Sequence, residues 1–330
     1  MENGIILTLA YPETIVSHAD EWYSKFLRFV GIGSKYHVKA GHAALVLINR
    51  ETGILEYHDF GRYITPEPDG RVRGRDTDHE LEFPMKAVFS GKRIDNLYDI
   101  FNFLATKPKI THGEGTLYAS VCMAINYENA RAHIDVMQQR GFMRYAAFIN
   151  DACNCARFVT DAVIAGLTDK SIKKKLVKSK KFTPSTIGNV VLADSENYVY
   201  KISEEGTVED FKSSVFKENW KLFTDGLKSY QPSIVGTIEP KYNQEKADHA
   251  QWLGGIAAGA WFELYDLKSD TEYRFRRISP DGHVDVDATY KIDQDGFDIH
   301  QPYQFVHYSN CKFFHIEQNG LTFRFEIIKK

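Results

Sequence analysis

The stretch Asn150–Val159, NDACNCARFV, places a cysteine at the expected start of a helix. Small capping residues come first, and apolar residues then recur at helical spacing as far as Gly166. Cys155 is therefore expected in the first turn, where backbone N–H groups and the helix dipole favour the reactive thiolate. We take Cys155 as the candidate nucleophile. The alternative is the common fate of a free cysteine, a small buried core residue.

A thiolate nucleophile needs a proton acceptor, and His42 at the mouth of an apolar strand can supply one. Every residue from 43 to 48 is apolar, residues 50–53 (RETG) have turn chemistry, and residues 54–60 fit a returning strand. The pattern predicts a hairpin with His42 at its edge. Alternatively, His42 is a strand-end histidine bonded to the backbone, so its role as base depends on Cys155.

The residue that orients His42 should come from the returning strand, where Glu56, Tyr57, His58 and Asp59 compete. A two-residue turn closed by Arg50 and Gly53 puts Asp59 on the face of His42. A three-residue turn with a bulge presents Glu56 and His58 instead. We choose Asp59, because a carboxylate both fixes the imidazole tautomer and stabilises the imidazolium.

Three segments taken in order, GHAAL (41–45), EYHDFGRY (56–63) and NCARFV (154–159), carry a family resemblance. They resemble the circularly permuted branch of the NlpC-type papain-like peptidases, the YiiX-like proteins, in which histidine precedes cysteine. The resemblance covers roughly residues 5–190. It implies an α+β, papain-like domain whose helix-borne Cys155 packs on an antiparallel sheet. It also implies chemistry through a thioester, which peptidases, amidases and lecithin-retinol-type acyltransferases share.

The length of 330 residues favours two modules. We expect a papain-like domain over 1–190, a connecting segment over 191–231 and a smaller, mostly β C-terminal module over 232–330. Expected helices cover 18–31, 97–104 and 127–140, and an expected strand covers 116–125. Residues 61–79 are expected to form a long irregular loop. In the C-terminal module, strands are expected at 272–278, 283–292, 305–316 and 321–328, joined by tight Asp-Gly and Asn-Gly turns.

Several other features have both a functional and a plain interpretation. Arg71, Arg73 and Arg75 could clamp a substrate carboxylate or phosphate, or belong to a solvated loop. The lysine-rich stretch 170–181 could bind nucleic acid, but its apolar residues favour an exposed helix with a solvated face. The glycine-rich run 252–262 could line a binding surface, and we favour packing against the first domain. Cys153 lies two residues from Cys155, hence on another helix face, and is expected to be structural, although Cys153 or Cys122 could become a redox partner.

The overall composition narrows the class of protein. A net charge of -3 and a pI near 6.5 give no electrostatic case for nucleic acid as partner. The N-terminal run IILTLA (5–10) lacks the basic start and cleavage site of a secretory signal, and no apolar run is long enough to insert into a membrane, so a cytoplasmic address is expected. No metal or cofactor is implied, and the oligomeric state stays open.

The residues thus favour a cysteine hydrolase of amide bonds. In this hypothesis His42 deprotonates Cys155, the thiolate attacks a carbonyl, and water releases the acyl group. The expected partner is a small-molecule or peptide substrate with an amide or ester bond. Two alternatives stay open at this point: acyl transfer by the same pair of residues, and a noncatalytic binding or scaffold protein that retains the fold.

Overall fold

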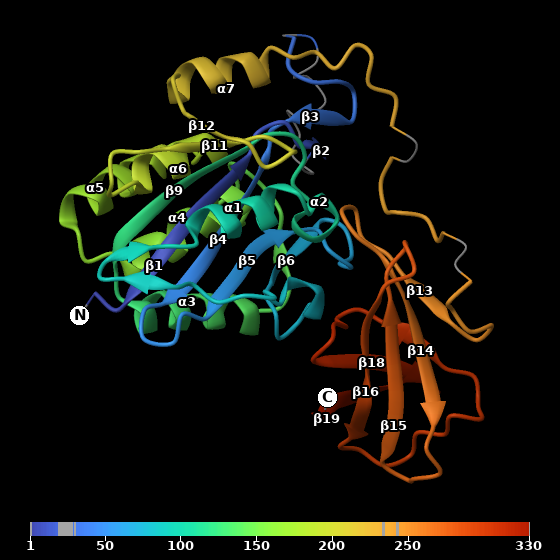
Figure 1. Cartoon of the computed structure of the whole chain (residues 1–330). Helices are drawn as coiled ribbons and strands as arrows, with labels where there is room; N and C mark the ends of the chain where they lie inside the picture. The colour runs from blue at the N-terminus through green and yellow to red at the C-terminus, as the bar shows by residue number, and fades with distance from the viewer. Residues whose placement is uncertain (1, 19–28, 30, 233–234, 242–243, 330) are drawn as a thin grey trace.

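A computed structural model describes residues 2–18, 29, 31–232, 235–241 and 244–329. It is a mixed α+β structure with two large sheets (Figure 1). Most of the helix expected over 18–31 lies outside the described residues. The larger sheet has the order β10-β6-β5-β4-β1-β9-β11-β12, and every neighbouring pair in it is antiparallel. Its strands are β1 (Gly4–Tyr11), β4 (His42–Asn49), β5 (Leu55–Gly61), β6 (Asp69–Arg73), β9 (Leu117–Ile125), β10 (Met143–Arg144), β11 (Tyr200–Ile202) and β12 (Val208–Asp210).

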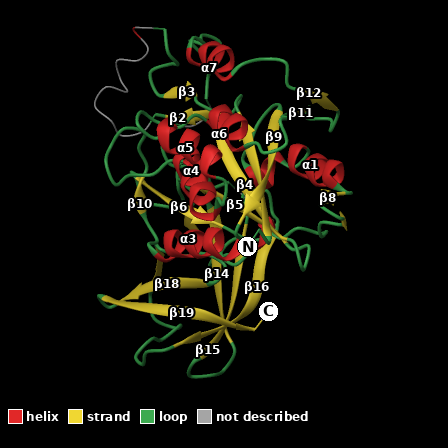
Figure 2. Cartoon of the chain, turned by 90° about the vertical axis from the view of Figure 1, so that its left-hand side faces the viewer, coloured by secondary structure: helices red, strands yellow, loops and turns green. Residues whose placement is uncertain are grey.

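Helices cover both faces of this sheet, so its central strands are buried on both sides. Helices α3 (Tyr127–Gln139) and α4 (Cys155–Gly166) pack on one face, against Leu45 and Leu47. Helix α1 (Leu97–Ala105) packs on the other, against Val46 and Ile48 (Figure 2). Alternate residues of β4 therefore enter two different cores. The smaller elements near this domain are β2 (Ile15–Ser17), β3 (His37–Lys39), a 3₁₀ turn (His79–Leu81), β7 (Phe89–Ser90), β8 (Arg93–Ile94), α2 (Pro108–Thr111), α5 (Lys170–Ser179), α6 (Thr186–Ala193) and α7 (Val215–Phe223).

The C-terminal module is a separate antiparallel sheet of the order β13-β14-β15-β16-β19-β18-β17. The Gln251 side chain donates to the carbonyl of Tyr303 and accepts from the N–H of Phe305, which links the two edges of the sheet, so it nearly closes into a barrel. Phe275 and Phe314 stack at the centre of its aromatic core. Its strands are β13 (Gln251–Leu253), β14 (Ala260–Asp266), β15 (Glu272–Ile278), β16 (Val284–Ile292), β17 (Gln304–Val306), β18 (Phe313–Gln318) and β19 (Leu321–Lys329).

The two modules share backbone hydrogen bonds. Ile64 donates to the carbonyl of Ala258 at 3.2 Å, Ala257 donates to that of Arg62 at 2.9 Å, and Cys311 donates to that of Thr77 at 2.9 Å. The prediction that the run 252–262 packs against the first domain is confirmed by these contacts. The expected boundaries near 190 and 232 stay predictions, although β11 and β12 add to the main sheet as far as residue 210.

Two expected elements are wrong in part. Residues 61–79 are not irregular throughout, because they contain β6, in which Val72 enters the core while Arg71 and Arg73 form buried ion pairs. Charged residues at core positions hid this strand from the sequence pattern. The strand expected over 305–316 is two strands, β17 and β18. Asn310 Oδ1 accepts from the N–H groups of Lys312 and Phe313, and this local turn ends the ladder between them.

Candidate active site

Cys155 begins helix α4, as predicted. Asn154 caps the helix by accepting from the N–H of Arg157 at 2.9 Å. The Arg157 guanidinium donates to the carbonyls of Ala147, Ile149 and Ala152, which fixes the loop that leads into the helix. Cys155 itself is only 6% exposed. The thiol is thus held at a helix N-terminus by a rigid, well-bonded loop.

His42 is the first residue of β4, at the end of the sheet nearest this thiol. Gly41 precedes it with φ +74°, a conformation that favours glycine. The ring Nε2 lies 3.1 Å from Asp59 Oδ2, and the Cys155 side chain is close enough to contribute to the raised pKa of the ring. The structure therefore brings Cys155, His42 and Asp59 together.

The hairpin register decides which acid reaches His42. Ala44 pairs with Asp59 and Leu45 with His58, which is the register expected for the shorter turn. Asp59 therefore lies on the face of His42. The alternative orienting residues face elsewhere: Glu56 is bonded to Tyr127 and Arg131, and His58 Nδ1 lies 3.2 Å from the carbonyl of Arg73.

Asp59 is fully buried and has several strong donors. Arg73 donates twice, from Nε to Oδ1 at 3.0 Å and from Nη2 to Oδ2 at 2.7 Å. The hydroxyls of Tyr57 and Tyr63 each donate to Oδ2 at 3.1 Å. Sequence reasoning missed these partners in this role. The one available signal for the tyrosines was their position within EYHDFGRY beside the acid.

These contacts set the charges of the site. Burial alone would lower the pKa of His42, but hydrogen bonds to Asp59 and Cys155 outweigh it and raise that pKa to about 9. Burial raises the pKa of Cys155, yet the hydrogen bond and charge of His42 outweigh it, and the net pKa is lowered. Burial also opposes ionisation of Asp59, but Arg73 and His42 hold its pKa well below the usual range. Both shifts favour the thiolate–imidazolium pair over the neutral thiol and imidazole.

Tyr145 adjoins the thiol, and sequence reasoning did not single it out. Its hydroxyl donates to Cys155 Sγ at 3.9 Å, and its ring stacks on Phe60 with centroids 5.9 Å apart. The Arg62 guanidinium lies over the Tyr145 ring, 4.7 Å from its centroid. Burial and the nearby Cys155 charge raise the pKa of Tyr145 well above its ordinary value, so its hydroxyl stays a donor.

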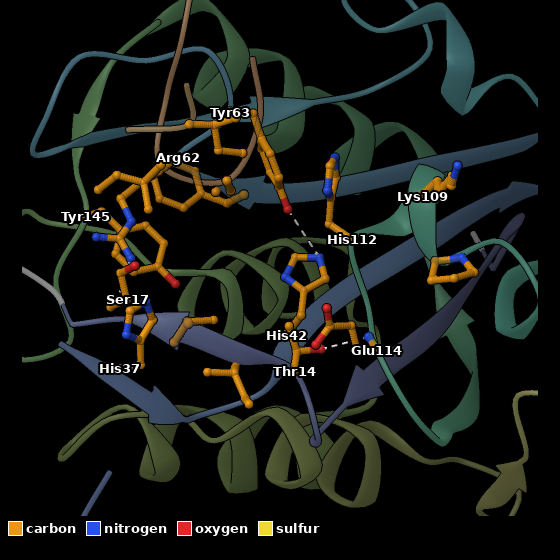
Figure 3. Close-up of a pocket in the computed structure, with 18 of the residues that line it drawn as sticks. Thr14, Ser17, His37, His42, Arg62, Tyr63, Lys109, His112, Glu114 and Tyr145 are labelled. Atoms are coloured by element: carbon orange, nitrogen blue, oxygen red, sulfur yellow. Dashed lines mark hydrogen bonds between the residues drawn. The ribbon is translucent and has the colours of Figure 1, made fainter. Parts of the chain in front are cut away.

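A cavity of about 860 Å³ opens beside this group. His42, Tyr63, His112 and Tyr145 line it together (Figure 3), while Cys155 is not among its lining residues. A second cavity of about 620 Å³ lies between the two modules. Both are lined by a shared set: Tyr63, Lys109, His112, Ile238 and Ala257. The two cavities thus adjoin, and the first is lined by His42 as well as by Ile256 and Ala257 of the C-terminal module; we call the two together the groove.

The three arginines proposed as a substrate clamp differ in their surroundings. Arg71 is buried and bonded bidentately to Asp78 at 2.6 and 2.7 Å, and Arg73 is bonded to Asp59. Both line the second cavity. Arg75 is partly exposed and lies 3.9 Å from Asp76. The expected solvated loop is therefore wrong for Arg71 and Arg73, whose guanidinium groups bind carboxylates of the protein itself.

Two further expectations concern the other cysteines and the lysines. Cys122 and Cys153 are buried and unpaired, and burial raises the pKa of each to about 12. The lysine-rich stretch forms α5, with Ile172 and Leu176 buried and the lysines on the opposite side, so the prediction of an exposed helix is confirmed. Within the described ranges, no group of three or more His, Cys, Asp or Glu residues is placed to hold a metal ion. None of the helices that the structure describes is long and apolar enough to cross a membrane.

Comparison with known proteins shows the family to which this chain belongs. A family model described as type VI secretion system effector TseH-like matches residues 6–172, about half of the chain. The chain belongs to the TseH-like family. A second family model, the DUF6695 C-terminal domain, matches residues 250–328. The TseH-like match contains Cys155, His42 and Asp59, and the DUF6695 match coincides with the C-terminal β module.

A solved structure is also similar. The crystal structure of the type VI secretion system effector TseH matches with a TM-score of 0.43 and 18% identity, covering 63% of this chain and 98% of that chain. The search of curated proteins found no match.

Proposed function

We propose that this TseH-like chain is a cysteine hydrolase of amide bonds, with Cys155 as nucleophile, His42 as base and Asp59 as its orienting acid. The single observation that carries the proposal is the position of His42, whose Nε2 lies 3.1 Å from Asp59 Oδ2 and whose pKa is raised by both Asp59 and Cys155. A papain-like core of the permuted NlpC type is part of the proposal, supported by the chain order in which histidine precedes a helix-borne cysteine.

The reaction follows from these positions. The Cys155 thiolate attacks the substrate carbonyl, and the backbone N–H of Cys155 helps hold the oxyanion. The His42 imidazolium then gives its proton to the leaving amine, and a thioester remains on the sulfur. His42, now neutral, takes a proton from water, which attacks the thioester. The carbon–sulfur bond breaks, the acid leaves, and the Cys155 thiolate and His42 imidazolium are restored.

The groove indicates how substrate reaches the thiol. Cys155 is buried and does not line the first cavity, whereas His42 and Tyr145 do. In this proposal the carbonyl approaches the thiol between these two side chains. The rest of an extended substrate lies along the groove towards the C-terminal module. We therefore propose a peptide or acyl-amide substrate, longer than a single residue. The family name also suggests that the chain acts as a secreted effector, so the expected cytoplasmic address stays untested.

A second candidate is acyl transfer. The adjoining second cavity leaves room for an amine or alcohol acceptor beside the acyl donor, and the same Cys155 and His42 would serve. A model ester incubated with and without an amine acceptor separates the two reactions, because transfer yields the acylated amine in preference to the free acid.

Thiol reactivity tests the proposal directly. Iodoacetamide at pH 7 is expected to label Cys155 at least about tenfold faster than an ordinary exposed thiol, because the thiolate is stabilised. His42→Ala should remove that advantage. The matched control His300→Ala replaces an exposed histidine of the C-terminal module and should change nothing. If Cys155 reacts no faster than glutathione, and His42→Ala leaves the rate unaltered, the hydrolase proposal fails.

A further inference from the structure

A buried arginine of the C-terminal module reaches into the first module. Arg277, on β15, is 1% exposed. Its Nη1 donates to Asp78 at 3.1 Å and its Nη2 to Glu80 at 2.8 Å, and both acids belong to the first module. Its Nε donates to Asp285 of its own module at 2.9 Å. One guanidinium thus joins three carboxylates across the module boundary.

The acids that Arg277 binds also touch the arginines behind the proposed active site. Asp78 is held bidentately by Arg71. Glu80 Oε1 lies 3.9 Å from Nη1 of Arg73, the arginine that clamps Asp59. A continuous series of ion pairs therefore runs from Arg277 through Glu80 and Arg73 to Asp59. The last member of the series is the carboxylate that orients His42.

We propose that the C-terminal β module is a working part of the active site, and that Arg277 is a positioning residue that keeps Arg73 on Asp59. This inference rests on the proposed role of Asp59 and His42. It assigns the DUF6695-like module a task in catalysis in addition to its packing.

The physical reason is competition between two carboxylates for one guanidinium. Asp59 accepts from Nη2 of Arg73 at 2.7 Å and from its Nε at 3.0 Å. Glu80 Oε1 lies 3.9 Å from the third nitrogen, Nη1. Arg277 neutralises Glu80 and so removes the competitor. Without Arg277, the one other cation that the described ion pairs give Glu80 is Arg73, and a carboxylate that is only 18% exposed strongly attracts a counter-ion.

The other titratable groups that face Arg277 supply no cation for Glu80. Asp78 accepts from both Arg71 and Arg277. Asp285 is an acid whose burial raises its pKa to about 7, although Arg277 acts to lower it. Burial raises the pKa of the Cys311 thiol well above its ordinary value, which keeps that neighbour neutral. The Arg73 guanidinium also lies 3.8 Å from the centroid of the Tyr63 ring, and the Tyr63 hydroxyl donates to Asp59. A displaced Arg73 would therefore disturb two partners of Asp59, Arg73 itself and Tyr63.

The test is the pH profile of Cys155 alkylation in the full-length chain carrying Arg277→Met. A loosened Asp59 orients His42 less well, so the thiol should gain about one pH unit in apparent pKa and react about tenfold more slowly at pH 6. Arg274→Met is the matched control. Arg274 lies on the same strand but pairs with Asp287 inside the module, and its profile should coincide with the parent protein.

A second substitution separates positioning from simple packing. In Arg277→Met/Glu80→Gln the competing carboxylate is gone, so the alkylation profile should return to within about 0.3 pH unit of the parent. Arg277→Lys keeps the charge and the fold while bonding fewer acids, and should shift the profile in the same direction by less. The inference is overturned if Arg277→Lys leaves the profile unchanged, or if removing Glu80 fails to restore it. A parent protein with no activated thiol would instead defeat the proposed function.

Discussion

Replacing Asp59 with asparagine removes the charge that holds both His42 and Arg73. The fully buried carboxylate accepts from His42, Tyr57, Tyr63 and Arg73. In Asp59→Asn an amide N–H must face one of these donors, and Arg73 loses its counter-ion. Leaving a buried charge without a partner costs about 3–5 kcal/mol of folding free energy. The variant should therefore unfold at clearly lower denaturant concentration.

The effect on the thiol follows from the pKa of His42. That pKa is about 9 with Asp59 present, against an ordinary value of 6.5, and burial alone lowers it. The difference corresponds to about 3 kcal/mol of preference for the imidazolium. Without the Asp59 charge, the thiolate–imidazolium pair is no longer favoured at pH 7. Alkylation of Cys155 should therefore slow by about 100-fold.

The assay is the rate of iodoacetamide labelling of Cys155 between pH 5 and 10, followed by mass spectrometry of the peptide. Asp76→Asn, a change at an exposed acid, serves as the control. If Asp59→Asn folds too poorly, Asp59→Asn/Arg73→Met removes the orphaned cation, which should recover stability without recovering reactivity. A variant that folds and labels within about twofold of the parent, at every pH, would refute the role given to Asp59.

Three further predictions follow from the same contacts. Activity should depend on pH in a bell shape, which a kcat/KM profile would measure: it falls on the acid side as Cys155 is protonated, and on the alkaline side as His42 loses its proton near pH 9. An alkylation profile should show only the acid side, because the thiolate alone reacts with iodoacetamide. Tyr145→Phe removes a donor to the sulfur and should slow alkylation at pH 6 by about two- to fivefold, with no change at high pH where the thiol is already ionised. Gly41→Ala should lower the free energy of unfolding, measured in denaturant, by about 1–3 kcal/mol, because the added Cβ would lie 2.8 Å from Pro12 Cα at a positive φ. Gly91→Ala, at a positive φ in open space, should lower it by less. Equal losses in the two variants would contradict the steric argument.

The parts of the fold predicted best from sequence are those set by local chemistry. Capping residues and helical spacing placed Cys155 in the first turn of α4, and turn residues 50–53 allowed a register that brings Asp59 beside His42. Strand β1 shows the limit of that approach. Its run IILTLA is the central, doubly buried strand of the sheet, but a short continuous apolar run has no alternation from which to recognise a strand. From the sequence, the run IILTLA was considered only in relation to a secretory signal.

The rest of the site depends on contacts between distant segments. Arg73 lies in a segment that appeared to be a polar loop, because its neutralising acids, Asp59 and Glu80, come from other elements. Tyr145 reaches the thiol only because the loop 146–154 folds back onto β10 and places it there. Arg277 is nearly 200 residues from Asp78 in the chain. Buried ion pairs of this kind leave no periodic pattern, since each charge occupies a position where the pattern expects an apolar residue.

Cys153 and Cys155 show what the tertiary structure adds to the motif. The two thiols lie two residues apart, and both are almost fully buried. Burial raises the pKa of Cys153 to about 12, whereas His42 lowers that of Cys155 against the same burial. In the segment NDACNC (150–155), burial disfavours ionisation of both thiols, but α4 begins at Cys155 while Cys153 precedes the cap residue Asn154. Cys155 also has the His42 imidazole beside it, which Asp59 and, through Asp59, Arg73 support. If the proposed function and the proposed role of Arg277 hold, the reactivity of Cys155 depends on a buried charge series that begins in the other module.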